Sequence, residues 1–340
     1  QDHPARTRGV SPAGIRVECV GDAPIITPAS HPSIGTNIQG PSVIRVPHWL
    51  PNPLGRYYCY FADHKGSFIR LAFADEVEGP WTVHVPGSLH LADSGFPTQD
   101  LPLDDATFDR IAARYREALG DQMPADIRDD LVAAHIASPD VHVDDERREI
   151  VMYLHGLETL GDQRTRVALS GDGVTFRALP DTQGPSYFRC FSLDGWWYAL
   201  AMPGRFFRSR DGRTDFEEGP RLFDASMRHS AVRVVDGPSG RELEVFWTRV
   251  GDAPERIVRT RVAIEGDWTG WHELGEPVDV LRPERSYEGA DEPCEPSRRG
   301  AVNHAVNQVR DPCLFRDPDR GGWWLFYAVA GESGIALARL

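Results

Sequence analysis

The chain repeats one pattern of short strands and turns five times, and this repetition limits the folds open to it. In each repeat an aromatic or aliphatic strand ends in a polar loop, and a second strand then runs into a turn. The five copies read YYCYFADHKGSFIRLAFADEVEGPW, IVMYLHGLETLGDQRTRVALSGDGVTF, WWYALAMPGRFFRSRDGRTDF, LEVFWTRVGDAPERIVRTRVAIEGDW and WWLFYAVAGESGIALARL. Each follows a β-rich opening segment, and Pro139, Pro185 and Ala231 recur at equal spacing in three of those segments. Repeats of this length built from four strands are typical of propeller blades, so the sequence predicts an all-β, five-bladed propeller with an axial pocket.

The alternation of apolar and polar residues places three strands in each predicted blade. The innermost strands are expected to start near residues 41, 139, 185, 230 and 311. The second strands are expected at 57–61, 150–154, 196–200, 243–248 and 323–328, and the third at 67–74, 164–169, 205–209, 256–264 and 334–339. The last blade runs out of chain after its third strand. We therefore expect the N-terminal segment IRVECVGDAPIITP to supply its outer strand, which removes an open sheet edge.

Two insertions interrupt the repeat, and both fall between an outer strand and the next innermost strand. The first, about 96–134, contains DDATFDRIAARYREALG, whose apolar residues share one helical face before Gly120. A second short helix is expected at PADIRDDLVAAH, headed by Pro124. The other insertion, about 282–309, is polar and rich in turns. Residues 1–340 are thus expected to form a single propeller domain with a small α-helical insertion between the first and second blades.

The amino-acid composition argues against some classes of binding partner but gives little information on the cellular compartment. Lys and Arg number 37 against 51 Asp and Glu, a net charge of −14 at pH 7, which argues against nucleic acid or an anionic membrane as partner. The five cysteines form no CxxC pair. The chain starts at Gln1 and not at Met, and we expect a processed, secreted or periplasmic protein, with a cytoplasmic location left open. No feature of the sequence indicates an oligomeric state.

The polar loops are expected to gather on one side of the disc. Because strands in a blade alternate in direction, the loops between second and third strands emerge on the same side as both insertions. Loops on a rigid scaffold are common positions for binding and catalytic residues. We take nine residues as candidates for substrate binding: Gln39, Asp140, His155, Arg228, Arg249, Arg256, Glu288, His304 and Glu332. A polar ligand such as an oligosaccharide or glycoside is expected, with solvated loop tips as the alternative for each charge taken alone.

The opening segments resemble those of the five-bladed β-propeller glycoside hydrolases, families 43, 32 and 117 among them. The segment RDPCLFRD carries Arg310, Asp311 and Pro312, and resembles the Asp-Pro start whose carboxylate faces the axial pocket in family 43. The segment MRHSAV resembles the axial His segment of that family. The resemblance implies a central water or a structural Ca²⁺ near His229. Hard cations prefer several oxygen ligands and no acidic cluster accompanies His229, so a hydrogen-bonded core histidine is the alternative.

The family's catalytic carboxylates do not carry over to this chain. At the position of the family's Asp, the five opening segments carry Gly40, Ser138, Gly184, Ser230 and Asp311. Only Asp311 matches. The resemblance implies a proton donor and a base or nucleophile on either side of the anomeric carbon. We take Asp311 as base or nucleophile, with pairing to Arg310 or capping of backbone amides as its structural alternative.

The candidate acids are His64, Asp63 and Glu292. Asp63 and His64 lie in the segment ADHKG, where a loop ion pair is the alternative to catalysis. Glu292 lies in the second insertion, where a flexible acidic lid is the alternative. The resulting hypothesis is an exo-acting glycoside hydrolase. Two alternatives stay open: a non-catalytic glycan-binding propeller, favoured by the missing carboxylates, and a lyase acting on a uronic-acid-containing glycan.

Overall fold

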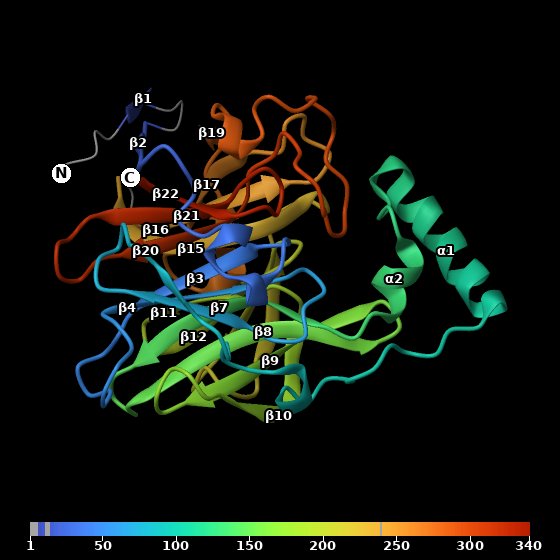
Figure 1. Cartoon of the computed structure of the whole chain (residues 1–340), viewed down its shortest axis with the longest axis horizontal. Coiled ribbons are helices and arrows are strands. Elements are labelled where there is room, and N and C mark those ends of the chain that lie inside the picture. Colours follow the sequence, from blue (N-terminus) through green and yellow to red (C-terminus); the bar gives the residue numbers. More distant parts are fainter. Residues whose placement is uncertain (1–5, 11–13, 239) are drawn as a thin grey trace.

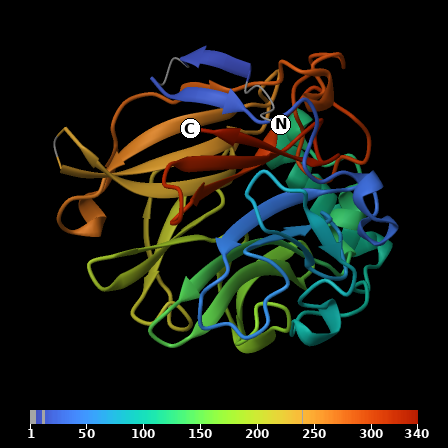
Figure 2. The same cartoon turned by 60° about the vertical axis from the view of Figure 1, so that its left-hand side comes forward.

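The computed structural model describes residues 6–10, 14–238 and 240–340. Its strands form five separate sheets, which are arranged around a common axis (Figure 1, Figure 2). Each sheet is antiparallel and is built almost entirely from strands that follow one another in the sequence. The predicted five-bladed propeller is therefore confirmed. Gln1, on which the expectation of a processed precursor depends, lies outside the described residues.

Four blades take their strands in sequence order from the axis outward. The first blade contains β3 (Gln39–Arg45), β4 (Tyr57–Ala62), β5 (Arg70–Ala74) and β6 (Thr82–His84). The second contains β7 (Ile136–Asp144), β8 (Glu149–Thr159), β9 (Asp162–Ser170) and β10 (Arg177–Pro185). The third contains β11 (Arg189–Leu193), β12 (Trp196–Ala201), β13 (Arg205–Ser209) and β14 (Glu217–Arg221). The fourth contains β15 (Met227–Gly237), β16 (Gly240–Arg249) and β17 (Ile257–Ala263), with β18 (His272–Glu273) and β19 (Val278–Leu281) both pairing with β17.

The fifth blade combines both ends of the chain. Its inner strands are β20 (Arg310–Arg316), β21 (Trp323–Ala328) and β22 (Ile335–Arg339), and its outer strands are β2 (Arg16–Cys19) and β1 (Arg6–Val10). β2 pairs antiparallel with β22, with Cys19 opposite Ala338. The predicted closure by the N-terminal segment is confirmed, and Figure 2 shows the blue N-terminal strands beside the red C-terminal ones. Pairing with β2 covers an edge of β22 that would otherwise present free backbone groups.

The second strand of each blade is buried between its neighbours, which explains the apolar runs in the repeat. All six residues of β4 are buried, for example. Aromatic residues from the first and fifth blades, including Tyr57, Trp324 and Phe326, share one core cluster across the closure. Val17 of β2 belongs to a second cluster with Leu325 and Tyr327 of β21. Side-chain packing and strand pairing therefore both close the ring.

In four blades the innermost strand is interrupted near its beginning by a β-bulge, which inserts one extra residue and re-aims a side chain, and the third blade has its matching position just before β11. The ladder steps from the pair Gln39–Ala62 to the pair Ser42–Tyr60 in the first blade, and the second, fourth and fifth blades show the same shift. In the third blade the regular ladder starts only at Arg189, and the Met202 N–H donates to the Ser186 carbonyl at 3.2 Å. The first bulge residues are thus Gly40, Ser138, Tyr187, Arg228 and Asp311.

This alignment corrects two sequence-based assignments. The position matching Asp311 is Tyr187 in the third blade and Arg228 in the fourth, and not Gly184 and Ser230. Gly184 belongs to β10, where it pairs with Thr165 of the second blade. The innermost strand of the third blade therefore starts at Arg189 and not near residue 185. The equal spacing of Pro139, Pro185 and Ala231 does not correspond to equivalent positions.

The first insertion forms the predicted helix α1 (Asp105–Leu119) and a shorter helix α2 (Ile127–Val132), which stand out from the disc in Figure 1. Asp104 caps α1 by accepting a hydrogen bond from the Thr107 N–H at 2.8 Å, and Gly120 follows its last residue at a positive φ of 51°. α2 starts at Ile127, after its cap Asp126, and not at Pro124. In the part of the chain that the structure describes, no helix combines the length and apolar character needed to cross a bilayer.

Truncation of Val17 tests the contribution of β2 to ring closure. Val17 is 1% exposed, and removing two buried methyl groups costs about 2 kcal/mol in lost burial and residual cavity. We expect Val17→Ala to lower the free energy of unfolding in urea by this amount. The matched change Val85→Ala, at a site that is 50% exposed, is expected to alter it by less than about 0.5 kcal/mol. Equal effects of the two substitutions would contradict a stabilising role for β2.

Candidate functional site

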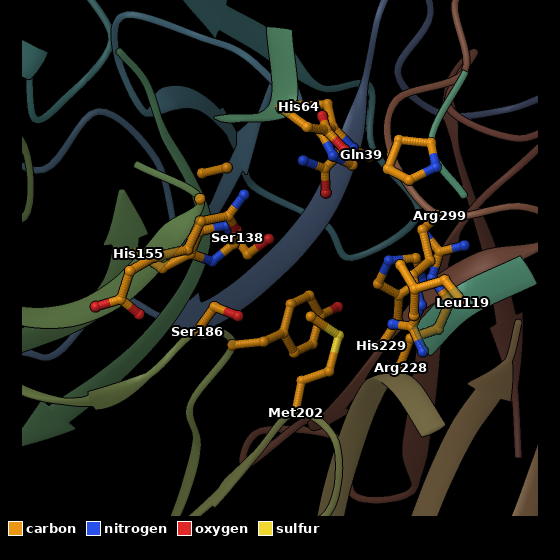
Figure 3. A pocket seen from close by; sticks show the side chains of 18 of the residues that line it. Gln39, His64, Leu119, Ser138, His155, Ser186, Met202, Arg228, His229 and Arg299 are labelled. Atoms are coloured by element: carbon orange, nitrogen blue, oxygen red, sulfur yellow. The ribbon is translucent and has the colours of Figure 1, made fainter. Parts of the chain in front are cut away.

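A cavity of about 320 Å³ opens at the axial end of the innermost strands. The bulge residues Ser138, Tyr187 and Arg228 line it, together with His64 from the loop after β4. Both insertions contribute, with Tyr115 and Leu119 from the first and Arg299 and Gly300 from the second. Figure 3 shows His155, Ser138 and Ser186 on one wall, and Arg228, His229 and Arg299 on the facing wall. The cavity is therefore built from blades and insertions together, on the side where the sequence predicted polar loops.

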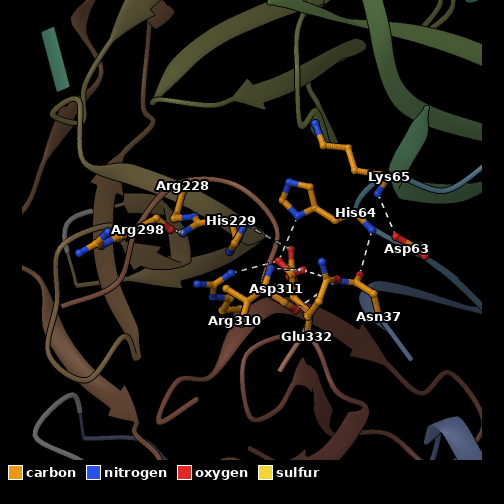
Figure 4. Close-up of polar contacts among 12 residues, drawn as sticks. Asn37, Asp63, His64, Lys65, Arg228, His229, Arg298, Arg310, Asp311 and Glu332 are labelled. Carbon is orange, nitrogen blue, oxygen red and sulfur yellow. Dashed lines mark hydrogen bonds and ion pairs between the residues drawn. The ribbon is translucent and has the colours of Figure 1, made fainter. Parts of the chain in front are cut away.

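Glu332 is the hydrogen-bonding centre behind this cavity (Figure 4). Its buried carboxylate accepts from Asn37 Nδ2 at 2.7 Å, Arg310 Nη1 at 3.0 Å and the Val302 N–H at 3.1 Å, and His64 Nδ1 lies 3.0 Å away. Burial alone would raise the pKa of Glu332, but His64 and Arg310 hold that pKa well below its usual range. Glu332 is thus an anion that fixes the orientation of the His64 ring.

Arg310 extends this charged network toward the fourth blade. It is completely buried, and its Nε lies 3.3 Å from Glu255 Oε2 and donates to Gln308 Oε1 at 3.1 Å. The same Glu255 oxygen lies 3.5 Å from Arg228 Nη1, and this Arg228 nitrogen also donates to the Arg298 carbonyl at 2.9 Å. Glu255 and Glu332 therefore compensate guanidinium groups that burial would otherwise make costly.

Asp311 lies on the axis behind the cavity. It is 1% exposed and has a positive φ of 47°, an uncommon backbone conformation that is often found at functional sites. The Tyr187 hydroxyl donates to its Oδ1 at 2.7 Å, and His229 Nε2 lies 3.8 Å from the same oxygen. Its Oδ2 is buried and has no hydrogen-bond partner among the described residues. Burial raises the pKa of Asp311 to about 6, although the Tyr187 hydrogen bond opposes that shift.

Two histidines of the cavity walls, His155 and His229, are held neutral. Burial, and then the positive charges of Arg228 and Arg310, lower the pKa of His229 well below its usual value. Burial and the neighbouring His135 do the same to the pKa of His155. Neutral imidazoles accept as well as donate hydrogen bonds. These side chains are therefore suited to bind the hydroxyl groups of a polar ligand.

Five of the sequence-based candidates line the cavity: Gln39, His64, His155, Arg228 and His229. Asp311 and Glu332 lie directly behind it, in contact with lining residues. Asp63 forms the loop ion pair considered as its alternative, with its Oδ2 3.3 Å from Arg70 Nη2, and it accepts a hydrogen bond from the Lys65 N–H at 2.9 Å. Asp63 therefore stabilises the loop that carries His64.

Other candidates lie away from the cavity. Glu292 and His304 are exposed on the second insertion. Glu288 is buried and accepts hydrogen bonds from the Tyr327 hydroxyl and from two backbone N–H groups, so it stabilises the start of that insertion. Arg256 pairs with Asp279 at 2.8 Å and with Asp252 at 3.1 Å, and Arg249 lies over the ring of Trp247 at 5.2 Å from its centroid.

Asp140 faces a second cavity, of about 130 Å³, farther along the axis. It accepts a hydrogen bond from the Cys190 N–H at 2.7 Å and lies 2.8 Å from His142 Nε2. Although burial favours its neutral form, His142 and Arg189 lower the pKa of Asp140. Arg189 lines this second cavity and lies over the Tyr187 ring, which lines the first. Asp140 is thus separated from the first cavity by a layer of side chains.

The residues around His229 do not fit a calcium site. Within the described ranges, no group of three or more His, Cys, Asp or Glu residues is placed to hold a metal ion. Thr248 Oγ1 lies 3.3 Å from His229 Nδ1, and the carboxylates of Glu255 and Asp311 each lie 3.8 Å from a ring nitrogen. The positive charges of Arg228 and Arg310 also act on the ring and lower its pKa. Cationic neighbours disfavour a bound cation, so no step is assigned to one.

Sequence reasoning missed several residues of the site. Arg310 was identified only as part of the segment RDPCLFRD, and its ion pairs were not predicted. These pairs, with Glu255 and Glu332, connect the fourth and fifth blades. Arg299 was overlooked because it lies in a polar insertion without regular structure. The Tyr187–Asp311 hydrogen bond joins the third and fifth blades, and the misplaced start of the third innermost strand concealed it. Correct alignment of the bulges is the signal that would have paired them.

Comparison with solved structures shows the same fold in glycoside hydrolases, and no protein-family model matches the chain. A GH43 β-xylosidase/α-arabinofuranosidase from a compost microbial metagenome is 12% identical, with 95% of each chain covered and a TM-score of 0.54. The GH43_1 enzyme from Xanthomonas citri, solved with xylose, is 13% identical, with 94% of this chain and 89% of that chain covered and a TM-score of 0.54. The α-L-arabinofuranosidase from Lactobacillus brevis is 9% identical, with 91% and 92% covered and a TM-score of 0.50. Similarity at these identities concerns the fold alone.

A closer relationship exists in sequence to a viral protein. The uncharacterized protein R118 of Acanthamoeba polyphaga mimivirus is 35% identical over 326 residues, which cover 89% of this chain and 83% of that protein. Identity at this level extends over most of both chains. The chain therefore belongs to the same protein family as the mimivirus protein R118.

Proposed function

We propose that the protein is a carbohydrate-active enzyme, an exo-acting glycoside hydrolase whose substrate enters the axial cavity. The observation that carries this proposal is the convergence of the His64–Glu332 pair and of Asp311, with its partners Tyr187 and His229, at one cavity. Solved glycoside hydrolases with the same fold support the substrate class, and one of them was solved with xylose. A cavity of about 320 Å³ is at the small end of ligand sites, which favours binding of a terminal sugar over the middle of a chain.

His64 is the proposed general acid. Glu332 holds its Nδ1 at 3.0 Å, so the imidazolium form presents Nε2–H to the cavity that His64 lines. A histidine oriented by a buried carboxylate is a common arrangement for proton transfer. Of the other two candidate acids, Asp63 pairs with Arg70, and Glu292 is exposed and outside the cavity lining. We therefore leave Glu292 out of the mechanism.

Asp311 is the proposed base or nucleophile. Tyr187 occupies its Oδ1, which leaves Oδ2 to accept a proton or to attack the anomeric carbon. The carboxylate is buried, and this raises its proton affinity. A pKa of about 6 for Asp311 means that the reactive, ionised form predominates above that pH.

A non-catalytic glycan-binding propeller is the second candidate. One observation favours it: the bulge position of Asp311 is occupied by Gly40, Ser138, Tyr187 and Arg228 in the other blades. In the resemblance described above, the catalytic carboxylates of family 43 do not carry over to these positions. A protein of this second kind would bind sugars at the same cavity without turning them over.

Substitution of Asp311 separates these candidates. On a panel of aryl glycosides and polysaccharides, we expect release of single sugars by the natural protein and a loss of kcat of about 10²–10⁴-fold in Asp311→Asn, as for removal of a catalytic acid or base. Asp194→Asn is the matched control, because Asp194 is exposed and pairs with Arg241 on the protein surface. Saturable sugar binding without turnover would establish the binding-module alternative. An unsaturated product absorbing in the near ultraviolet would establish a lyase instead.

The pH profile tests the Tyr187–Asp311 hydrogen bond. If Asp311 must be ionised, kcat/KM falls as the pH drops below about 6. Tyr187→Phe removes a hydrogen bond that lowers the pKa of Asp311, so the acidic limb is expected to move up by about one to two pH units, the equivalent of a hydrogen bond to a charged group. Tyr60→Phe is the control, since the buried Tyr60 hydroxyl donates to the Gly173 carbonyl outside the cavity. An unchanged limb in Tyr187→Phe would remove Asp311 from the mechanism.

A further inference from the structure

Two guanidinium groups lie on one wall of the cavity. Arg228 is the first bulge residue of β15, and Arg299 belongs to the second insertion. Figure 3 shows both beside His229, on the wall facing His155. They come from different elements, and the fold holds each in place separately. Their proximity is therefore a property of the folded cavity and not of the local sequence.

Arg228 is buried, and its charge is only partly compensated. It is 4% exposed, and its nearest carboxylate oxygen, on Glu255, lies at 3.5 Å. That oxygen is also 3.3 Å from Arg310 Nε, so two guanidinium groups share it. Burial lowers the pKa of Arg228, Glu255 raises it, and the neighbouring Arg310 lowers it further. Glu332 and Asp311 also raise this pKa, so the carboxylates around Arg228 are shared among several guanidinium groups.

Arg299 has weaker compensation still. Its side-chain Nη2 donates to the Ala225 carbonyl at 2.7 Å, and its backbone N–H donates to the Gln122 carbonyl at 3.4 Å. Its Nε is buried without a hydrogen-bond partner among the described residues. Burial, and then the positive charge of Arg228, lower the pKa of Arg299. The backbone thus holds Arg299 in position, while part of its guanidinium remains unsatisfied.

The acidic residues of the cavity do not neutralise this wall. Asp130 pairs with Lys65, whose Nζ lies 2.8 Å from its Oδ1. Asp162, the other acidic lining residue, and Asp130 both act on the pKa of Tyr115, which places them around the first insertion. A buried or half-buried cation without a partner is costly, and a bound anion removes that cost. The buried Nε of Arg299 therefore remains available to an anion bound in the cavity.

We propose that the Arg228–Arg299 wall binds the carboxylate of an acidic sugar, so that the substrate class is uronic-acid glycosides. This inference rests on the proposed function, since it assumes that the cavity takes a sugar. A carboxylate would accept a hydrogen bond from the unsatisfied Nε of Arg299. Its two oxygens also match the planar fork of a guanidinium group. The neutral histidines, His155 on the facing wall and His229 beside the two arginines, then bind the ring hydroxyls.

Binding of free sugars tests the inference without requiring turnover. In calorimetric titrations at pH 7, the full chain is offered D-glucuronate and D-galacturonate, each paired with its neutral counterpart, D-glucose or D-galactose. We expect the acid of at least one pair to bind with a Kd at least tenfold lower, equivalent to about 1.4 kcal/mol. In Arg299→Gln this preference is expected to fall below threefold, with the Kd of the neutral sugar unchanged. Arg299→Lys keeps the charge and is expected to retain part of the preference.

Arg241→Gln is the matched control, because Arg241 pairs with Asp194 and Glu265 in an exposed cluster and is expected to leave the preference intact. Equal affinities for acidic and neutral sugars in the natural protein would overturn the inference and leave the proposed function standing. Failure of every sugar to bind would overturn both. Displacement of the uronate by an equal concentration of inorganic sulfate would also overturn the inference, since it would identify a plain anion site.

Discussion

One backbone irregularity, the bulge at the start of each innermost strand, decides which side chains face the axis. The extra residue turns Ser138, Tyr187, Arg228 and Asp311 toward the same central space. Three of these residues adopt positive φ angles, which cost energy outside glycine and persist only where the surrounding sheet enforces them. Four sheets with the same bulge, together with the matching position before β11 in the third blade, therefore give a ring of inward positions. Each blade can fill its position with a different chemical group.

The charges at this ring are compensated through a chain of contacts and not in isolated pairs. Glu332 joins His64 of the first blade to Arg310 of the fifth, and Glu255 joins Arg310 to Arg228 of the fourth. A buried charge is tolerated when partners and hydrogen bonds surround it. Removal of one partner leaves the remaining charge buried and uncompensated, which is strongly destabilising. The network thus makes the geometry of the site and the association of three blades depend on the same residues.

The fold was predictable because strand alternation and aromatic enrichment are local signals, and nearly every expected strand lies within a few residues of its observed position. The helix at 105–119 was predictable for the same reason, from Asp104, an apolar face and Gly120. The site was predictable only in part. His64, Arg228 and His229 lie in or beside regular strands and were identified, whereas Arg299 depends on an insertion whose path follows no periodicity. Prediction of the Tyr187–Asp311 hydrogen bond required the exact register of the third blade. Gly184 and Pro185 resemble the start of an innermost strand in sequence, although they belong to β10.

Pairing of β2 with β22 has a consequence for synthesis on the ribosome. β2 and β22 lie at opposite ends of the described chain. β2 is therefore synthesised well before β22 and cannot pair with it until β22 has been made. Until then the disc has a gap, and the edge of the fifth blade can pair with strands of other molecules. Contacts between such distant residues also slow folding, because a long loop must close before they form. Successful production of the protein thus depends on protecting an incomplete ring until its final strand has left the ribosome.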